Sequence, residues 1–162
     1  MQKKNIKDLL GSLIEVDFRK CGGTPVISGT RIPIAMVVKL LKMGWDPKDI
    51  LSEFDIPKEK LEKIIKNFDI LNRFSEALSL IEIDKRKLRG MPVVRGTRVP
   101  AYYVYSLLKN GWSINELMDE FPTLRKCDIE ALLKYRDVLE PFLERIYKKL
   151  TEKLHGDIGR VI

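Results

Sequence analysis

The sequence is poor in the residues that most often build metal centres, disulfide frameworks and catalytic sites. Its 162 residues include only two cysteines and one histidine. Cys21 and Cys127 belong to no C-x-x-C pair and have no second candidate ligand nearby, which does not favour a zinc site or a disulfide. His155 stands alone in the C-terminal tail, without a histidine pair or a cysteine partner. We therefore expect no enzyme activity, no cofactor and no metal.

Long apolar runs are also lacking. No stretch of 18 apolar residues occurs, and the N-terminus "MQKKNIKDLLGSLIEVD" has lysines but no apolar run of signal-peptide length. We expect a cytoplasmic protein with no membrane partner.

The charge balance is positive. Thirty basic and 23 acidic residues give a net charge of +7, which favours polyanionic partners such as nucleic acid. No segment is a basic tail, so a nucleic-acid interface would have to be local.

A tandem repeat organises the chain. Shifting the sequence by 67 positions places residues 12–54 over residues 79–121, and 22 of these 43 pairs are identical. The motif "SGTRIP" at residues 28–33 returns as "RGTRVP" at residues 95–100. A match of this extent indicates a duplication.

Each copy predicts a strand hairpin followed by three helices. "LIEVD" alternates apolar and polar residues as a strand does, and "PVIS" or "PVVR" supplies its partner. Pro33 and Pro100 lie where the first helix would start, and Gly44 and Gly111 where it would end. Ser113 and the glutamate three positions later predict a capping box on the second helix. The third helix of the first copy is expected to run on through "KNFDILNRFSEAL".

The predicted fold class is mainly α with short β-hairpins. We expect tandem three-helix helix-turn-helix repeats of the homeodomain-like type that form a pseudo-twofold pair, and two such hairpins can join into one small sheet. The expected organisation is an N-terminal extension (1–11), a first repeat (12–78), a second repeat (79–140) and a C-terminal amphipathic helix and tail (141–162). The tail places Val138, Phe142, Ile146, Leu150 and Leu154 at helical spacing, for packing on its own domain or for docking a partner or second chain as a homodimer.

The arginine of the repeated motif has two interpretations. In one, Arg31 pairs with Asp17 or Glu53, and Arg98 pairs likewise in the second copy, so that the motif is structural. In the other, the guanidinium binds phosphate. The threonine before each arginine is a candidate cap for the helix that follows. Neither copy has the spacing of a phosphate-binding nucleotide loop.

The strongest local signal for nucleic acid is the stretch "KRKLRGMPVVRGTR" at residues 85–98, which contains no acid. Such a run predicts a phosphate-contacting surface, although a merely solvated basic loop is the alternative. The third helix of the first copy adds lysines on its outward face, but acidic residues are interleaved with them and offset their charge. The candidate DNA-binding residues are Lys85, Arg86, Lys87, Arg89, Arg95, Arg98, Arg31, Lys60 and Lys63.

The repeated pattern "GxPVIxGTRIP", followed by an apolar helix, Gly-Trp and a third helix, resembles a prokaryotic family of short homeodomain-like proteins listed as a domain of unknown function. The resemblance covers about residues 13–74 and 80–139. It implies a helix-turn-helix fold without catalysis and places the family's GTR arginine at Arg31 and Arg98. Family members look like VapB-type antitoxins, whose partners are PIN-like ribonuclease toxins.

These patterns together predict a non-enzymatic protein that binds double-stranded DNA. The resemblance implies the role of antitoxin and autorepressor of a PIN-like ribonuclease toxin, with the C-terminal helix as the candidate docking element. The alternative is a protein-interaction module that never touches DNA.

Overall fold

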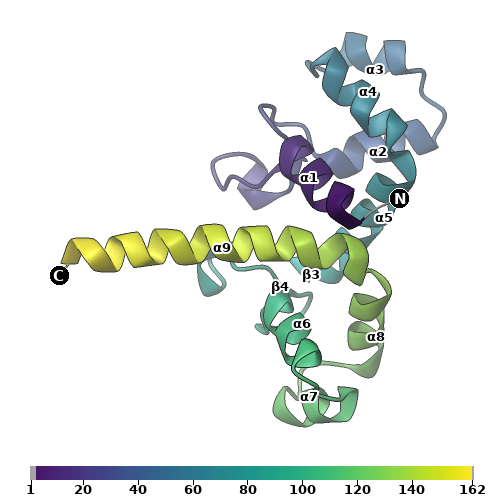
Figure 1. Cartoon of the computed structure of the whole chain (residues 1–162). Helices are drawn as coiled ribbons and strands as arrows, with labels where there is room; N and C mark the ends of the chain where they lie inside the picture. Colours follow the sequence, from purple (N-terminus) through teal and green to yellow (C-terminus); the bar gives the residue numbers. More distant parts are fainter. Residues whose placement is uncertain (1–2, 162) are drawn as a thin grey trace. The chain divides into compact units, whose positions relative to one another are not determined.

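The computed structural model describes the backbone of residues 3–161 and the side chains of residues 6–152. The chain divides into two compact units, residues 1–78 and 79–162, called the first and second unit below. It is mainly helical with two small antiparallel strand pairs (Figure 1). Leu154 and His155 lie outside the residues whose side chains are described.

The first unit begins with helix α1 (Lys3–Leu13), which leads directly into strand β1 (Ile14–Glu15). Strand β2 (Val26–Ile27) pairs antiparallel with β1, and the loop between them holds a short 3-10 turn, η1 (Cys21–Gly23). Four helices follow: α2 (Ile34–Lys42), α3 (Pro47–Glu53), α4 (Lys58–Lys66) and α5 (Phe68–Ala77).

The second unit repeats this order without a counterpart of α1. A short turn, η2 (Leu78–Leu80), precedes strands β3 (Ile81–Glu82) and β4 (Val93–Val94), which form their own antiparallel pair around turn η3 (Leu88–Gly90). Helices α6 (Ala101–Lys109), α7 (Ile114–Glu120), α8 (Lys126–Lys134) and α9 (Arg136–Val161) follow. Each hairpin is a separate two-stranded sheet, so the expected shared sheet is wrong.

Local chemistry sets the ends of the short helices. Gly44 and Gly111 adopt φ of +90° and +93°. The following tryptophan N–H bonds back to the Leu40 or Leu107 carbonyl, which is the Schellman arrangement. The capping box on α7 is confirmed, because Ser113 and the glutamate three residues on exchange hydrogen bonds of 3.1 and 3.2 Å.

The third helix of each unit ends sooner than expected. Asn67, with φ −113° and ψ 31°, separates α4 from α5, and Tyr135, with φ −103° and ψ 16°, separates α8 from α9. The prediction of one long third helix in the first copy is therefore wrong. The Asn67 amide donates to the Lys63 carbonyl at 2.9 Å and so satisfies an acceptor in the last turn of α4.

The core of the first unit lies between α1, the hairpin and helices α2, α4 and α5. Helix α1 is part of this core, because its Leu9, Leu10 and Leu13 are buried. The segment expected to be an extension over residues 1–11 thus belongs to the fold. Its apolar stripe stabilises the unit by removing about three leucine side chains from water, at roughly 2 kcal/mol each.

The second unit buries the start of the C-terminal helix. Val138, Leu139, Phe142 and Leu143 of α9 are at most 2% exposed, and α9 packs on α6 and α8. The helix begins at Arg136 and continues through Pro141, so residues 141–162 are not a separate helix. In the described part of the chain, no helix is long and apolar enough to cross a membrane.

The hydroxyl of Tyr105 is a specific test of this packing. Tyr105 is fully buried, and its OH donates to the Leu132 carbonyl at 2.6 Å. Tyr105→Phe should lower the free energy of unfolding by about 1–2 kcal/mol, because a buried acceptor loses its donor. Urea unfolding followed by circular dichroism measures the change.

Tyr103→Phe is the matched control. Tyr103 is 48% exposed, and its hydroxyl has no hydrogen-bond partner among the described residues, so the change should stay within about 0.5 kcal/mol. Equal losses in the two variants would contradict the assigned role of the Tyr105 hydroxyl.

Candidate nucleic-acid interface

The repeated GTR motif forms the turn between hairpin and helix. Its glycines adopt φ of +80° and +81°, a region that favours glycine. Thr30 Oγ1 donates to the Ile27 carbonyl at 2.8 Å and accepts from the Ile32 N–H at 3.0 Å, and Thr97 makes the same two bonds. The threonine therefore closes the turn.

The prediction that these threonines cap the next helix is wrong. The N-cap positions of α2 and α6 are Pro33 and Pro100, and neither receives a side-chain cap hydrogen bond. Each proline instead forms an isolated β-bridge, with Val26 or Val93, and so continues the hairpin up to the first turn of the helix.

An aspartate on each hairpin binds the arginine two residues later. Arg19 donates from its backbone N–H and from two guanidinium nitrogens to the Asp17 carboxylate, at 2.8, 3.1 and 3.1 Å. Arg86 makes the same three bonds to Asp84, at 2.9, 3.1 and 3.0 Å. The Arg19 side chain holds the pKa of Asp17 down at about 2, and Arg86 lowers the pKa of Asp84 in the same way.

A glutamate on each hairpin is paired as well. Glu15 accepts from Lys20 Nζ at 2.6 Å and from the Gly29 N–H at 3.1 Å, so it links the first strand to the GTR turn. Glu82 accepts from Lys87 Nζ at 3.0 Å. Lys20 first, and then the Gly29 N–H, lower the pKa of Glu15. Both acids of each hairpin are thus occupied by local partners.

The motif arginines remain outside these pairs. Arg31 and Arg98 are exposed, and neither side chain makes a hydrogen bond or an ion pair with the residues that the structure describes. The expected pairing of Arg31 with Asp17 or Glu53 is therefore wrong, because Asp17 is bound to Arg19 and Glu53 is exposed. Two positive charges, one in each unit, are left for an external ligand.

The basic stretch at residues 85–98 divides into two halves by role. Arg86 and Lys87 are paired with acids, and Arg95 donates to the backbone carbonyls of residues 79 and 81 at 2.8 and 2.6 Å. The other three basic residues of the stretch are exposed and unpaired among the described residues: Lys85, Arg89 and Arg98. Local acids therefore neutralise two of the six basic side chains in the stretch, and the guanidinium of Arg95 keeps its charge but is held by the backbone.

Lys60 and Lys63 hold α4 against the hairpin. Lys60 Nζ donates to the Ser28 carbonyl and, at 2.8 Å, to Ser28 Oγ, while Lys63 Nζ donates to Ser12 Oγ at 2.7 Å. Their expected role in DNA contact is not favoured by these bonds, because the ammonium groups would have to leave the hairpin first.

The remaining charges of the third helices are largely balanced. Lys58 lies 4.0 Å from Glu62, and Lys126 lies 3.8 Å from Glu130. Arg125 and Asp128 pair at 3.1 Å at the start of α8. The third helices therefore present mixed rather than basic surfaces. Among the described residues, no group of three or more His, Cys, Asp or Glu side chains could hold a metal ion.

The hairpin and three-helix arrangement coincides with a known family. The model of DUF433, a protein family of unknown function, matches residues 14–66 and 81–135, about two thirds of the chain. The chain belongs to this family. Each DUF433 segment begins at the first strand residue of its unit and ends at, or one residue beyond, its third helix. Helices α1, α5 and α9 lie outside the two DUF433 segments.

No curated protein and no solved structure matches the chain. The function of this two-segment DUF433 protein must therefore be argued from its own residues.

The pKa of Asp17 tests which arginine it binds. An NMR titration of the carboxyl groups should place it at about 2, and Arg19→Ala should raise it toward, but not fully to, the value of an unpaired aspartate at about 3.9, because the backbone N–H of residue 19 still donates to the carboxylate. Arg31→Ala should leave it unchanged. Because the folded-state pKa is depressed, the pairing stabilises the hairpin above pH of about 4 and is lost as the pH falls toward 2. A pKa that responds to Arg31 instead would contradict the assignment.

Proposed function

We propose that this protein binds double-stranded DNA without catalysing a reaction, and that Arg31 and Arg98 contact backbone phosphates. One observation carries the proposal. The arginine of the GTR motif occurs in both repeats, yet neither fold uses its side chain, while the neighbouring repeated charges neutralise one another. A guanidinium fork suits phosphate because it donates two parallel hydrogen bonds.

The order of elements in each unit supports helix-turn-helix docking. The first helix after each hairpin is followed by a shorter second helix, a turn of four residues (54–57) or five residues (121–125), and a third helix, as in the three-helix DNA-binding units. In the second unit Lys85 and Arg89 extend the basic surface beyond the motif arginine. In the first unit the loop counterpart of Arg89 is Gly22. We therefore assign stronger phosphate binding to the second unit. Because the two units differ, the DNA site that they bind together need not be palindromic.

The double variant Arg31→Ala/Arg98→Ala tests the proposal. Its affinity for a mixed-sequence duplex of about 30 base pairs should fall at least tenfold at low salt, because two charge-assisted hydrogen bonds are lost. The slope of log K against log salt concentration should become less negative by about one for each arginine. Fluorescence anisotropy over a salt series measures both, and the urea midpoint should not change.

Arg19→Ala/Arg86→Ala is the charge-matched control. It removes the same two charges from the same hairpins, but these guanidinium groups are occupied by Asp17 and Asp84. Its DNA affinity should fall much less than that of the first variant. Equal losses would show that only net charge matters. Absence of DNA binding by the unaltered protein would favour the alternative of a protein-interaction module.

The cellular role that we propose with DNA binding is that of an antitoxin and autorepressor of a PIN-like ribonuclease toxin. Its support is the resemblance carried by both GTR motifs. Helix α9 is the proposed docking element: Val138 and Phe142 are buried in the second unit, whereas Ile146 and Leu150 continue the same stripe and are half-exposed. A half-exposed apolar stripe beyond the core suits a protein partner.

The adjacent reading frame provides the test of this role. It should encode a small ribonuclease, and co-expression of this protein should relieve the growth arrest that the nuclease causes. Ile146→Ser/Leu150→Ser should lose the rescue, while the control Lys149→Ala on the exposed side of α9 should keep it. An adjacent frame of another kind, or full rescue by the double-serine variant, would count against the role.

A further inference from the structure

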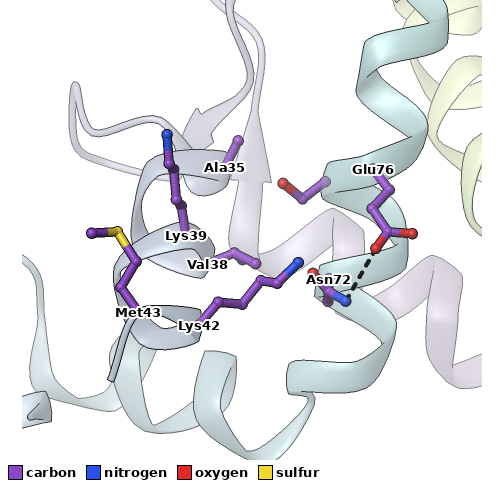
Figure 2. A pocket seen from close by; sticks show the side chains of 8 residues that line it. Ala35, Val38, Lys39, Lys42, Met43, Asn72 and Glu76 are labelled. Atoms are coloured by element: carbon purple, nitrogen blue, oxygen red, sulfur yellow. Dashed lines mark hydrogen bonds between the residues drawn. The ribbon is translucent and has the colours of Figure 1, made fainter. Parts of the chain in front are cut away.

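A hollow lies between α2 and α5 of the first unit (Figure 2). Ala35 and Val38 of α2 and Ser75 of α5 are among the residues that line it, and Lys39 and Met43 stand at its edge. Its volume is about 500 Å³, within the range of small-ligand sites. The hollow lies on helices α2 and α5, which pack against each other in the first unit.

The second unit fills the same place with its own side chains. Helix α9 follows α8 as α5 follows α4, which sets Ser75 opposite Leu143 in the repeat. The repeat likewise sets Ala35 opposite Tyr102 and Val38 opposite Tyr105. All three exchanges place a small residue in the first unit where the second has a large one.

The large residues of the second unit are packed. Tyr105 and Leu143 are buried, at 0% and 1% exposure. The ring of Tyr102 stacks on Tyr147 of α9, with the ring centres 4.8 Å apart and the planes at 26°. The face between the two helices thus holds aromatic rings in one unit and open space in the other. The groups that the first unit lacks at these positions are two tyrosine rings and a leucine side chain.

The hollow is lined by two lysines and by one acid, Glu76, which accepts a hydrogen bond from the Asn72 amide at 3.4 Å. Lys39 and Lys42 are exposed and have no ion pair among the described residues, and Figure 2 shows Lys42 reaching across the hollow in the direction of Asn72. Met43 is 66% exposed, and its thioether can contact an aromatic ring favourably. A second copy would bring Tyr147 together with Lys148 and Lys149, a basic segment that these lysines would repel.

We propose that the α2–α5 hollow of the first unit binds an aromatic side chain from an acidic segment of a partner protein. The ring takes the place that Tyr102 fills in the second unit, and the acidic residues beside it pair with Lys39 and Lys42. This site is independent of the proposed DNA contacts.

The probe is a labelled synthetic helical peptide that carries one tyrosine flanked by glutamates, titrated into the full chain by fluorescence anisotropy. Two reference peptides replace the tyrosine by alanine or the glutamates by lysines. The acidic tyrosine peptide should bind at least tenfold more tightly than either reference, because one reference lacks the aromatic ring and the other lacks the negative charges. Chemical shifts of the Ala35 and Val38 methyl groups should move with the same midpoint.

Ala35→Tyr fills the hollow as the second unit does and should weaken peptide binding at least tenfold. Lys48→Tyr, which adds a tyrosine at an exposed position of α3, is the matched control and should bind as the unaltered protein does. Lys39→Glu/Lys42→Glu should weaken binding about fivefold to tenfold, as expected for two exposed ion pairs. DNA binding should be the same in the Ala35→Tyr variant, which keeps the net charge of the protein, and this separates the test from that of the proposed function.

Two results would overturn the proposal. One is equal binding of the three peptides, or binding that Ala35→Tyr leaves unchanged. The other is self-association of the unaltered protein, measured by sedimentation equilibrium, that Ala35→Tyr abolishes, since the hollow would then take a second copy of this chain.

Discussion

The charge pairing within each hairpin is the constraint on which the rest of the account depends. A two-residue strand pair cannot hold a loop in place by backbone hydrogen bonds alone. In both units a glutamate and an aspartate bind the lysine and arginine that follow them, and Glu15 also receives the backbone N–H of the GTR turn. These bonds fix the loop and the turn together. They also consume every repeated hairpin charge except the GTR arginine, which is why that side chain stands free in both units.

The two units use one framework for different purposes. In the first, Lys60 of α4 binds Ser28 after the second strand and Lys63 binds Ser12 at the end of α1. In the second, Arg95 binds the backbone carbonyls of residues 79 and 81. The second unit keeps a more basic loop and packs its helix face with aromatic rings. The first unit has fewer basic residues in its hairpin loop, and it has an open hollow between α2 and α5. The two proposals above assign stronger phosphate contacts to the second unit and the aromatic ligand to the first.

Features governed by neighbouring residues were predictable from the sequence, and those governed by distant contacts were not. The glycine helix ends and the Ser113 capping box depend on groups a few positions apart, so the residue pattern revealed them. The membership of α1 in the core could not be seen, because burial of Leu9 and Leu13 depends on helices far along the chain. The sequence did not predict the partner of Asp17, although Arg19 is only two residues away. Several arginine and lysine side chains could reach this carboxylate, and only the folded loop decides which of them binds it. No proline or glycine marks the helix ends at Asn67 and Tyr135, so the sequence did not predict these breaks.

The central claim is that Arg31 and Arg98 are the arginines repeated in both units whose guanidinium groups are left for phosphate. The most direct measurement is an NMR titration of full-length, arginine-labelled protein with duplex DNA, following the side-chain Nε–Hε signals. The account predicts that the signals of Arg31 and Arg98 shift and become protected from exchange as DNA is added, while those of Arg19 and Arg86 keep their positions. Shifts confined to Arg19 and Arg86, or spread equally over all four side chains, would contradict it.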